Sequence, residues 1–549
     1  MKIVIVGAVA GGASAAARAR RLDESAEIVL IERGPDPSFA NCGMPYYIGG
    51  EIASRDKLLV APIELLRDRL KLDVRVRQSV ERIDRGRKRI SVLDLETDRE
   101  YVESFDKLIL SPGAAPIRPP IPGVDSSRVY TLRNLADADK IHSAVGESQR
   151  AVVVGGGFIG VEMVENLVRR GIQTTLVERN PQVLGPWDPE MVAPLAKVMR
   201  DAGAGLRLGD EVTAIEDGPS AATLTLKSGG SLEAGVVILA IGVRPESDLA
   251  SDAGLAVGQR GGIVVSPSMQ TSDPDIYAVG DAVQTTSAIT GKPAQAPLAG
   301  PANRQGRIAA DHIFGREVGF RGVQGTAVVG CFESTAAMTG LSEKACRAEA
   351  IEYDKVCIHP ASHAGYYPGA EPFSLKLLFA PTDGRVLGAQ AVGGAGVDKR
   401  IDVLATAIQA GLSVYDLEEA ELCYAPQYGS AKDPVNMAGF VAAGVLRGDQ
   451  RQVHADAIGD EPLVLDVRSP AEHKAGALPR AVNIPIEELR ERLDEVPADR
   501  PVVAYCKVGI RGYLATRLLA QHGRDASNLS GGYSSWSQHQ EAQRLAAGG

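Results

Sequence analysis

The stretch KIVIVGAVAGGASAAARARRLDESAEIVLIER, residues 2–33, reads as a strand, a tight turn, a helix and a second strand. Val and Ile follow one another in both strands, which is typical of parallel strands that are buried on both faces. Gly7, Gly11 and Gly12 let the backbone turn sharply and approach a pyrophosphate at the helix N-terminus, where free N–H groups and the helix dipole favour anions. Glu32 ends the second strand, where a carboxylate can accept hydrogen bonds from ribose hydroxyls.

The same design returns in RAVVVGGGFIGVEMVENLVRRGIQTTLVER, residues 150–179. Gly155, Gly157 and Gly160 form a G-x-G-x-x-G fingerprint after a strand, and Glu178 ends the strand that follows. One such pattern is a weak signal. Two patterns in one chain, each followed by an acidic residue at a strand end, predict two bound dinucleotides.

Charged residues beside the two fingerprints bear on which nucleotides bind. Glu178 would repel a 2′-phosphate, so we expect NADH at the second fingerprint, although the neighbouring Arg179 keeps NADPH open. In the first fingerprint Val9 replaces the second glycine, which weakens that copy of the motif. Arg33, next to Glu32, is a further candidate for contact with the nucleotide.

A third apolar segment, TSDPDIYAVGDAV at residues 271–283, runs up to Gly280 and Asp281, where a carboxylate can hold a flavin's ribityl hydroxyl. The segments LILSPGAAPIRPP (108–120) and VVILAIGVRPES (236–247) bracket the second fingerprint, and each is an apolar strand followed by glycine and proline. This composition is expected where a chain crosses between two nucleotide-binding domains.

The composition places limits on the protein class. A chain of 549 residues is too long for one core, and we expect three or four domains. The net charge of −10 argues against a nucleic-acid or anionic-membrane partner. The start carries no secretory signal, and no apolar run approaches the roughly 18 residues of a membrane span, so we expect a cytoplasmic protein.

The six cysteines form no CxxC pair, which argues against zinc-ribbon, iron–sulfur and thioredoxin sites. His359 and His363 are spaced like two metal ligands, but Pro360 disrupts a helix there and nothing else completes a site. We therefore expect no metal.

The order of two fingerprints and a late YAVGD is similar to that of the FAD-dependent pyridine nucleotide–disulfide oxidoreductases. Within them, SFANCGMPYYIGG (38–50) resembles the single-cysteine branch of coenzyme A-disulfide reductases, NADH oxidases and peroxidases. YYPGA (366–370) and CYAPQYGSAKDPVNMAGFVA (423–442) narrow the resemblance to the coenzyme A-disulfide reductase group. The resemblance covers residues 1–446. It implies FAD at the first fingerprint, NAD(P)H at the second, and a third domain that builds a homodimer.

Cys42 is the candidate redox centre. A dithiol enzyme of this family would need a second cysteine about five residues on, and Tyr47 stands there. Gly43 and Pro45 suit the start of a helix, whose dipole would lower the thiol pKa and favour the nucleophilic thiolate. By resemblance, electrons pass from NADH through FAD to a mixed disulfide between Cys42 and an external thiol.

The resemblance implies coenzyme A as that thiol, with two tyrosines of the other subunit reaching the cysteine. Tyr367 and Tyr424 match them best, as proton or hydrogen-bond donors to the leaving sulfur. Their neighbours Tyr366 and Tyr428 are not separated from them by the sequence. Further candidates for contact with coenzyme A are Ser38, Arg18, Arg21 and Lys71.

After residue 446 the strand pattern restarts, and RPVVAYCKVGIRGYLATRLLA (500–520) places Cys506 at the end of a buried strand, before a loop that runs to Arg511 and a helix. Loop N–H groups and an arginine form an anion-binding cradle that stabilises a thiolate or persulfide. CKVGIR and LDVRSPAEHKAGALPRAVNIP resemble a single-domain rhodanese over residues 455–549, in which Cys506 would carry sulfane sulfur. The remaining candidate residues of this domain are Lys507 and Gly509 in the loop and Asp466 and Arg468 as braces of the fold.

The sequence thus predicts an α/β protein with two Rossmann-like nucleotide-binding domains, an α+β dimerisation domain and a C-terminal α/β rhodanese domain. The expected boundaries are 1–111 with 245–320 for FAD, 112–244 for NAD(P)H, 321–446 for dimerisation and 455–549 for the rhodanese. A sulfur carrier fused to a flavin disulfide reductase suggests NAD(P)H-dependent reduction of coenzyme A persulfide or polysulfide to sulfide and free thiol. Alternatives are a coenzyme A-disulfide reductase, an NADH oxidase or peroxidase, and a sensor with structural FAD. RGDQRQ (447–452) hints at a flexible linker between the two thiol sites.

Overall fold

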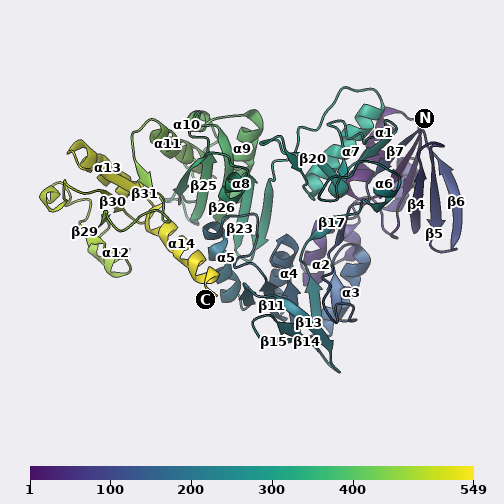
Figure 1. The fold of residues 1–549 in the computed structure, drawn as a ribbon, viewed down its shortest axis with the longest axis horizontal. Helices are drawn as coiled ribbons and strands as arrows, with labels where there is room; N and C mark the ends of the chain where they lie inside the picture. The colour runs from purple at the N-terminus through teal and green to yellow at the C-terminus, as the bar shows by residue number, and fades with distance from the viewer. Residues whose placement is uncertain (549) are drawn as a thin grey trace. The chain divides into compact units, whose positions relative to one another are not determined.

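The computed structural model describes residues 1–548, which form two compact units (Figure 1). The first unit holds Met1–Val177 and Glu211–Val323, and the second holds Glu178–Asp210 and the described chain from Gln324 onward. Within residues 1–548 no helix combines the length and apolarity that crossing a membrane requires.

The first unit contains a five-stranded parallel sheet whose strands read as continuous apolar runs because helices and a small sheet cover both faces. Its strands, in spatial order, are β19 (Ile276–Ala278), β7 (Lys107–Leu110), β1 (Lys2–Val6), β2 (Glu27–Ile31) and β3 (Asp73–Arg75). One face packs on α1 (Ala10–Leu22) and α7 (Ala299–Ile313), and the other on the antiparallel β4 (Gln78–Asp84), β5 (Arg89–Asp94) and β6 (Arg99–Ser104). Because β19 pairs with β7, a late segment completes the first domain, as expected from YAVGD.

A second parallel sheet follows the second fingerprint. Its strands are β11 (Gln173–Glu178), β10 (Arg150–Val154), β16 (Val236–Leu239) and β9 (Val129–Thr131), with helices α3 (Leu135–Gly146) and α4 (Phe158–Arg169). The antiparallel β13 (Val212–Asp217), β14 (Ala222–Leu226) and β15 (Ser231–Ala234) pack on it. The two chain crossings between the sheets pair with each other as β8 (Ala114–Pro116) and β17 (Val243–Pro245).

Short elements complete the first unit. They are η1 (Asn41–Gly43), α2 (Met44–Gly49), η2 (Arg55–Leu58), η3 (Leu65–Arg69), α6 (Asp248–Asp252), β18 (Ile263–Val264), η4 (Gly280–Ala282), β20 (Val283–Thr286) and β21 (Pro293–Ala294).

The second unit is built on an antiparallel sheet and a parallel sheet, which confirms the expected α+β and α/β classes. The antiparallel order is β22 (Ala327–Cys331), β23 (Ser334–Gly340), β26 (Val386–Gly393), β25 (Phe373–Phe379) and β24 (Asp354–Ile358). Its helices are α8 (Glu343–Ala348), α9 (Val397–Ala410), α10 (Val414–Glu419) and α11 (Pro434–Leu446). The parallel order is β27 (Gln452–Val453), β31 (Ala526–Leu529), β30 (Val502–Tyr505), β28 (Leu463–Asp466) and β29 (Val482–Asn483), with α12 (Pro470–Lys474), η5 (Leu493–Glu495), α13 (Ile510–Gln521) and α14 (Gly532–Ala546).

The segment Glu178–Asp210, which the sequence places in the second nucleotide domain, belongs to this second unit. It contains α5 (Pro189–Asp201) and β12 (Gly205–Leu208). Figure 1 shows α14, in yellow, running beside α5, where Leu545 packs against Ala193 and Ala196. Helix α5 therefore joins the dimerisation and rhodanese parts of the chain.

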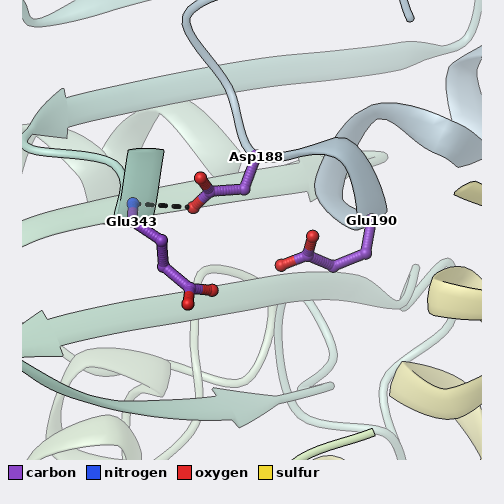
Figure 2. Close-up of side chains that lie close together, drawn as sticks. All are labelled: Asp188, Glu190 and Glu343. Carbon is purple, nitrogen blue, oxygen red and sulfur yellow. Dashed lines mark hydrogen bonds between the residues drawn. The ribbon is translucent and has the colours of Figure 1, made fainter. Parts of the chain in front are cut away.

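A buried ion cluster fixes the start of α5. Lys376 of β25 is fully buried, and its Nζ lies 2.9 Å from Asp188 Oδ2 and also contacts Glu190 and Glu343. Figure 2 shows the three carboxylates converging, with the Glu343 N–H donating to Asp188 at 3.1 Å. Burial opposes ionisation of Glu343, but the ammonium groups of Lys376 and Lys355 outweigh it and lower the pKa of Glu343 to about 2. The space among the carboxylates is thus taken by an ammonium group.

Replacing Lys376 should destabilise the second unit strongly. In Lys376→Met three carboxylates lose their buried counter-charge, and we expect a loss of about 3–5 kcal/mol in the free energy of unfolding. Thermal and urea unfolding of the two proteins would measure it. Lys197→Met, which removes an exposed ion pair of α5 with Asp201, should change stability far less, and equal losses in both variants would contradict a special role for the cluster.

Candidate functional site

Both glycine fingerprints form close strand–helix turns that larger residues could not adopt. A Cβ on Gly12 would lie 1.8 Å from the carbonyl oxygen of Gly7, and one on Gly160 would lie 1.9 Å from that of Gly155. A Cβ on Gly157, by contrast, would meet nothing within 4 Å, so chain packing does not explain that glycine. Open space over a helix N-terminus is the feature that a pyrophosphate requires, so this turn fits a dinucleotide.

The acidic residues at the two strand ends are held by neighbouring donors. Glu32 accepts backbone hydrogen bonds from Ala8 at 2.8 Å and from Gly34 at 2.8 Å. Glu178 accepts from the backbone of Asn180 at 2.8 Å and from its side-chain amide at 2.6 Å. Each carboxylate is thus oriented at the carboxyl end of its strand, where the ribose of a bound dinucleotide lies.

Asp281 lies in η4, directly after β19, at the same edge of the first sheet as Gly7. The preceding Gly280 donates its N–H to Gln305 Oε1 of α7 at 2.8 Å, which fixes the turn. Burial raises the pKa of Asp281, and the nearby Arg133 guanidinium opposes part of this rise. Arg33, the other candidate here, forms an exposed ion pair with Glu246 at 3.1 Å.

Cys42 lies in the three-residue η1, immediately before α2, and it is solvent-exposed. Its predicted low pKa is wrong. Partial desolvation by the surrounding protein raises the pKa of the Cys42 thiol, and the carboxylates of Glu162 and Asp281 raise it further. The helix dipole does not compensate, because η1 and α2 are short, while desolvation and the nearby carboxylates all act in the opposite direction.

Glu162, which was not predicted from the sequence, lies near this candidate site. It lies in the first half of α4, two residues after Gly160, and accepts a hydrogen bond from Tyr46 Oη of α2 at 3.3 Å. Burial raises the pKa of Glu162 to about 7, and the nearby Glu165 adds to the rise. The sequence feature that could have indicated Glu162 is its place in the first turns of the fingerprint helix, because the start of such a helix lies next to the bound dinucleotide. Glu162 and Asp281 therefore both act electrostatically on Cys42.

In the dimerisation domain the hydrogen-bonded pair of tyrosines is not the pair that the sequence matched best, Tyr367 and Tyr424. Tyr366 Oη and Tyr424 Oη lie 2.7 Å apart, and both side chains are exposed. Tyr367 instead packs edge-on against His363, with ring centroids 5.7 Å apart, while Tyr428 is exposed. The structure therefore brings Tyr366, the alternative that the sequence left open, together with Tyr424.

The coenzyme A candidates of the first unit have contacts within the fold. Arg18 of α1 binds the carboxylate of Asp311, with Nε 2.9 Å from Oδ1. Arg21 Nε donates to the Ala17 carbonyl at 2.9 Å, and the carbonyl of Lys71 accepts from Arg20. Ser38 has φ of 50°, an uncommon conformation for a side-chain-bearing residue, and such strain gathers at functional sites. Contact of these residues with coenzyme A stays a prediction.

In the rhodanese loop one backbone donor of the predicted cradle contacts the cysteine, and Arg511 binds a carboxylate. Cys506 is buried, and its Sγ accepts the N–H of Gly509 at 3.2 Å, at a glycine with φ of 101°. Arg511 binds Glu472 with two hydrogen bonds of 2.8 and 2.7 Å, and this pairing lowers the pKa of Glu472 to about 2. Asp466 accepts from Arg468, His473 and Tyr505, which agrees with its expected role as a brace. Lys507 Nζ lies 5.1 Å from the centre of the Tyr533 ring.

Protein-family models match the same three regions of the chain that the fold shows. Residues 1–306 match the family model of the pyridine nucleotide-disulphide oxidoreductases, and residues 326–433 match the dimerisation domain of the same family. The chain is a pyridine nucleotide-disulphide oxidoreductase. Residues 450–539 match the rhodanese-like domain, so the oxidoreductase carries a C-terminal rhodanese. Membership of the family implies FAD and NAD(P)H as cofactors, and the open space at Gly157 in the second fingerprint fits a dinucleotide.

Three similar proteins narrow the relationship. The oxidoreductase is 36% identical to the coenzyme A disulfide reductase of Staphylococcus haemolyticus, over 80% of this chain and 99% of the relative. The crystal structure of reduced Bacillus anthracis CoADR-RHD shares 47% identity, with a TM-score of 0.96 over 98% of both chains. The structure of an NAD-dependent persulfide reductase from A. fulgidus shares 36% identity, with a TM-score of 0.92 over 98% of this chain and 100% of that one.

Removing the charge of Glu162 should make Cys42 more acidic. Above about pH 7 Glu162 is ionised and raises the pKa of the thiol, so in Glu162→Gln the pH dependence of Cys42 alkylation should shift to lower pH. Mass spectrometry of the peptide that carries Cys42, after brief iodoacetamide treatment over a range of pH, would measure it.

Glu165→Gln is the matched control. Glu165 lies three residues after Glu162 on α4 and binds Arg169 at 2.9 Å. Glu165→Gln should therefore shift the pH dependence of Cys42 alkylation less than Glu162→Gln does. If Glu162→Gln leaves the Cys42 profile where it was, the electrostatic coupling is refuted.

Proposed function

We propose that this oxidoreductase uses NAD(P)H to reduce coenzyme A persulfide, or a related sulfane-sulfur compound, to sulfide and free thiol. The observation that carries the proposal is the presence of two unlike thiol sites in one chain. Cys42 is exposed beside the carboxylate expected to hold a flavin, and Cys506 is buried in a backbone cradle. The relatives named for coenzyme A disulfide and for persulfide support the same substrate class.

The nucleotide-binding residues hold and orient the cofactors. The turns at Gly7 and Gly155 would receive the pyrophosphates, Glu32 and Glu178 the riboses, and Asp281 the flavin side chain. FAD, when bound, supplies Cys42 with two electrons that originate in NAD(P)H. Glu178 is buried and negative, which favours NADH over a nucleotide with a 2′-phosphate.

The sulfur chemistry falls to Cys42. Its thiolate attacks the coenzyme A sulfur of the persulfide, the S–S bond breaks, and hydrosulfide leaves. The resulting mixed disulfide between Cys42 and coenzyme A takes up two electrons and one proton, which returns the Cys42 thiolate and releases coenzyme A thiol. Overall, one persulfide, one NADH and one proton yield coenzyme A, hydrogen sulfide and NAD⁺.

Proton supply would come from two groups. Glu162, with its pKa near 7 and its position beside Cys42, can hold a proton at neutral pH. The hydrogen-bonded phenols of Tyr366 and Tyr424 would donate to the leaving sulfur from the second subunit of a homodimer, as the dimerisation domain suggests. Tyr367 remains the alternative partner of Tyr424.

Cys506 would load sulfane sulfur as a persulfide in the loop of Lys507, Gly509 and Arg511 and pass it to a thiol acceptor such as coenzyme A. Reduction of coenzyme A disulfide by the same Cys42 is the second candidate function. It is favoured by the relatives that carry this activity in their name and match 80% of this chain.

Single serine replacements separate the two thiols. Cys42→Ser should lower NADH-dependent sulfide release from coenzyme A persulfide by at least about 100-fold, since the nucleophile is lost. Cys506→Ser should keep that activity but lose turnover with thiosulfate or polysulfide as sulfur donor. Sulfide release and NADH absorbance would be followed together.

Cys423→Ser is the control, because Cys423 is the other exposed cysteine and no role is assigned to it. Sulfide release that survives in Cys42→Ser would overturn the proposal. A specificity constant for coenzyme A disulfide far above that for the persulfide would favour the second function.

A further inference from the structure

The rhodanese part of the chain covers the open edge of the dimerisation sheet. β24 is the edge strand of that sheet, and edge strands present unpaired backbone groups. Gln452 Nε2 donates to the carbonyl of Lys355 at 2.7 Å, and the N–H of Cys357 donates to Ser530 Oγ at 3.1 Å. These residues are two apart, as expected for groups on one edge of a strand. Gln452 also belongs to the supposed linker, which is therefore attached to the sheet.

His359, directly after β24, continues this contact with both ring nitrogens. Its Nδ1 lies 2.9 Å from Ser374 Oγ of the same sheet, and its Nε2 lies 2.8 Å from Ser535 Oγ of α14. Gln538, one turn along α14, donates to Ser374 Oγ at 2.8 Å. Ser374 and Ser535 are both buried. The histidine therefore bridges two hydroxyl groups, one from each domain.

The start of α14 is also the support of the sulfur-carrying loop. Tyr533 donates its N–H to the Cys506 carbonyl at 2.8 Å, and Ser534 donates to the Lys507 carbonyl at 3.0 Å. A Cβ on Gly532 would lie 2.3 Å from the same Cys506 carbonyl, so the helix start touches the loop backbone. Ser535, the residue that His359 holds, follows these donors directly.

Gly531, directly before α14, packs closely against Ser535 and His359. Gly531 has φ of 67°, and a Cβ there would lie 2.0 Å from Ser535 Oγ and 3.0 Å from His359 Nε2. At its far end α14 is anchored again, where Leu545 packs on α5. The helix is thus held at both ends by residues outside the rhodanese.

We propose that His359, a residue of the dimerisation domain, is a positioning residue for the Cys506 loop, acting through Ser535 and the first turn of α14. The proposal rests on the proposed role of Cys506 as a sulfur carrier. In this proposal the rhodanese domain stays docked on the dimerisation sheet and does not move on a flexible linker. The sulfur of a Cys506 persulfide would therefore be transferred to a thiol acceptor that enters the loop.

The charge state of His359 suits this role. Burial lowers the pKa of His359 to about 4, and the ammonium of Lys507 adds to the effect, so the ring is neutral at neutral pH. A neutral imidazole has one donor and one acceptor nitrogen, and a serine hydroxyl can complement either. Amide side chains can therefore replace one of the two hydrogen bonds.

The test compares variants of the full-length protein in a reaction that needs Cys506 alone. The Cys506 thiolate takes the outer sulfur of thiosulfate and releases sulfite, and cyanide then removes that sulfur as thiocyanate. In His359→Ala and Ser535→Ala we expect kcat for thiocyanate formation to fall about 10-fold. Hydrogen exchange of the Tyr533 and Ser534 amides, followed by mass spectrometry, should accelerate in the same variants.

Conservative replacements of His359 separate the effect of its hydrogen bond to Ser535 from the effect of losing side-chain volume. Glutamine places its amide near Nε2 and asparagine near Nδ1, so His359→Gln should recover most of the activity and His359→Asn should not. NADH-dependent reduction of coenzyme A disulfide should remain unchanged in all four, which shows that the proteins are folded. If His359→Ala is insoluble, Ser535→Ala carries the test.

Unchanged thiocyanate formation and unchanged amide exchange in folded His359→Ala and Ser535→Ala would overturn the proposal. Recovery by asparagine equal to that by glutamine would do the same, because the bond to Ser535 would then be dispensable. Thiocyanate formation that survives in Cys506→Ser would instead refute the role of Cys506, and the amide exchange would still report on His359.

Discussion

The packing of α2 against α4 is the contact on which the redox site depends. A Cβ on Gly49 would lie 2.2 Å from Asn166 Oδ1, and Arg170 Nη1 donates to the Ile48 carbonyl at 2.6 Å. α2 follows Cys42 in the first nucleotide domain, whereas α4 is the fingerprint helix of the second. Their close approach brings Cys42 near the edge proposed to bind the flavin and the turn proposed to bind NAD(P)H. No second cysteine lies near Cys42 in the sequence, so the proposed electron transfer through this single thiol would depend on this arrangement.

The electrostatics of the site follow from the same packing. Glu162 is carried toward Cys42 on α4, and burial leaves its carboxyl with a pKa near neutrality. Two acidic groups beside a thiol oppose formation of the thiolate, which is the reverse of the effect expected from a helix N-terminus. Reactivity of Cys42 is therefore tied to the protonation of its neighbours. The dipole of a short helix is too weak to set it alone.

The two thiol sites differ in how the protein holds them. Cys42 is exposed on a short helix, while Cys506 is enclosed by a loop whose support comes from α14. α14 in turn is held by the edge of the dimerisation sheet and by α5, whose start is fixed by the ammonium of Lys376. The rhodanese is thus integrated into the second unit through polar contacts and one apolar patch. A few hydrogen bonds can hold the rhodanese at this sheet, because the edge strand presents backbone N–H and C=O groups that have no partner strand.

The sequence by itself determined the fold classes, the order of the domains and both fingerprints, and it singled out Cys42 and Cys506 as the candidate reactive cysteines. These features can be recognised from short stretches of sequence. The stretches are apolar runs that form strands, glycines at turns where the backbone approaches closely, and cysteines at the end of a strand or the start of a helix. Tertiary structure alone decided that Glu162 lies beside Cys42, that Tyr366 pairs with Tyr424 and that His359 reaches α14. Each joins segments 58 or more residues apart, and no local pattern records which faces of two distant elements meet. The pKa of Cys42 departed from expectation for the same reason, since its neighbours come from elsewhere in the chain.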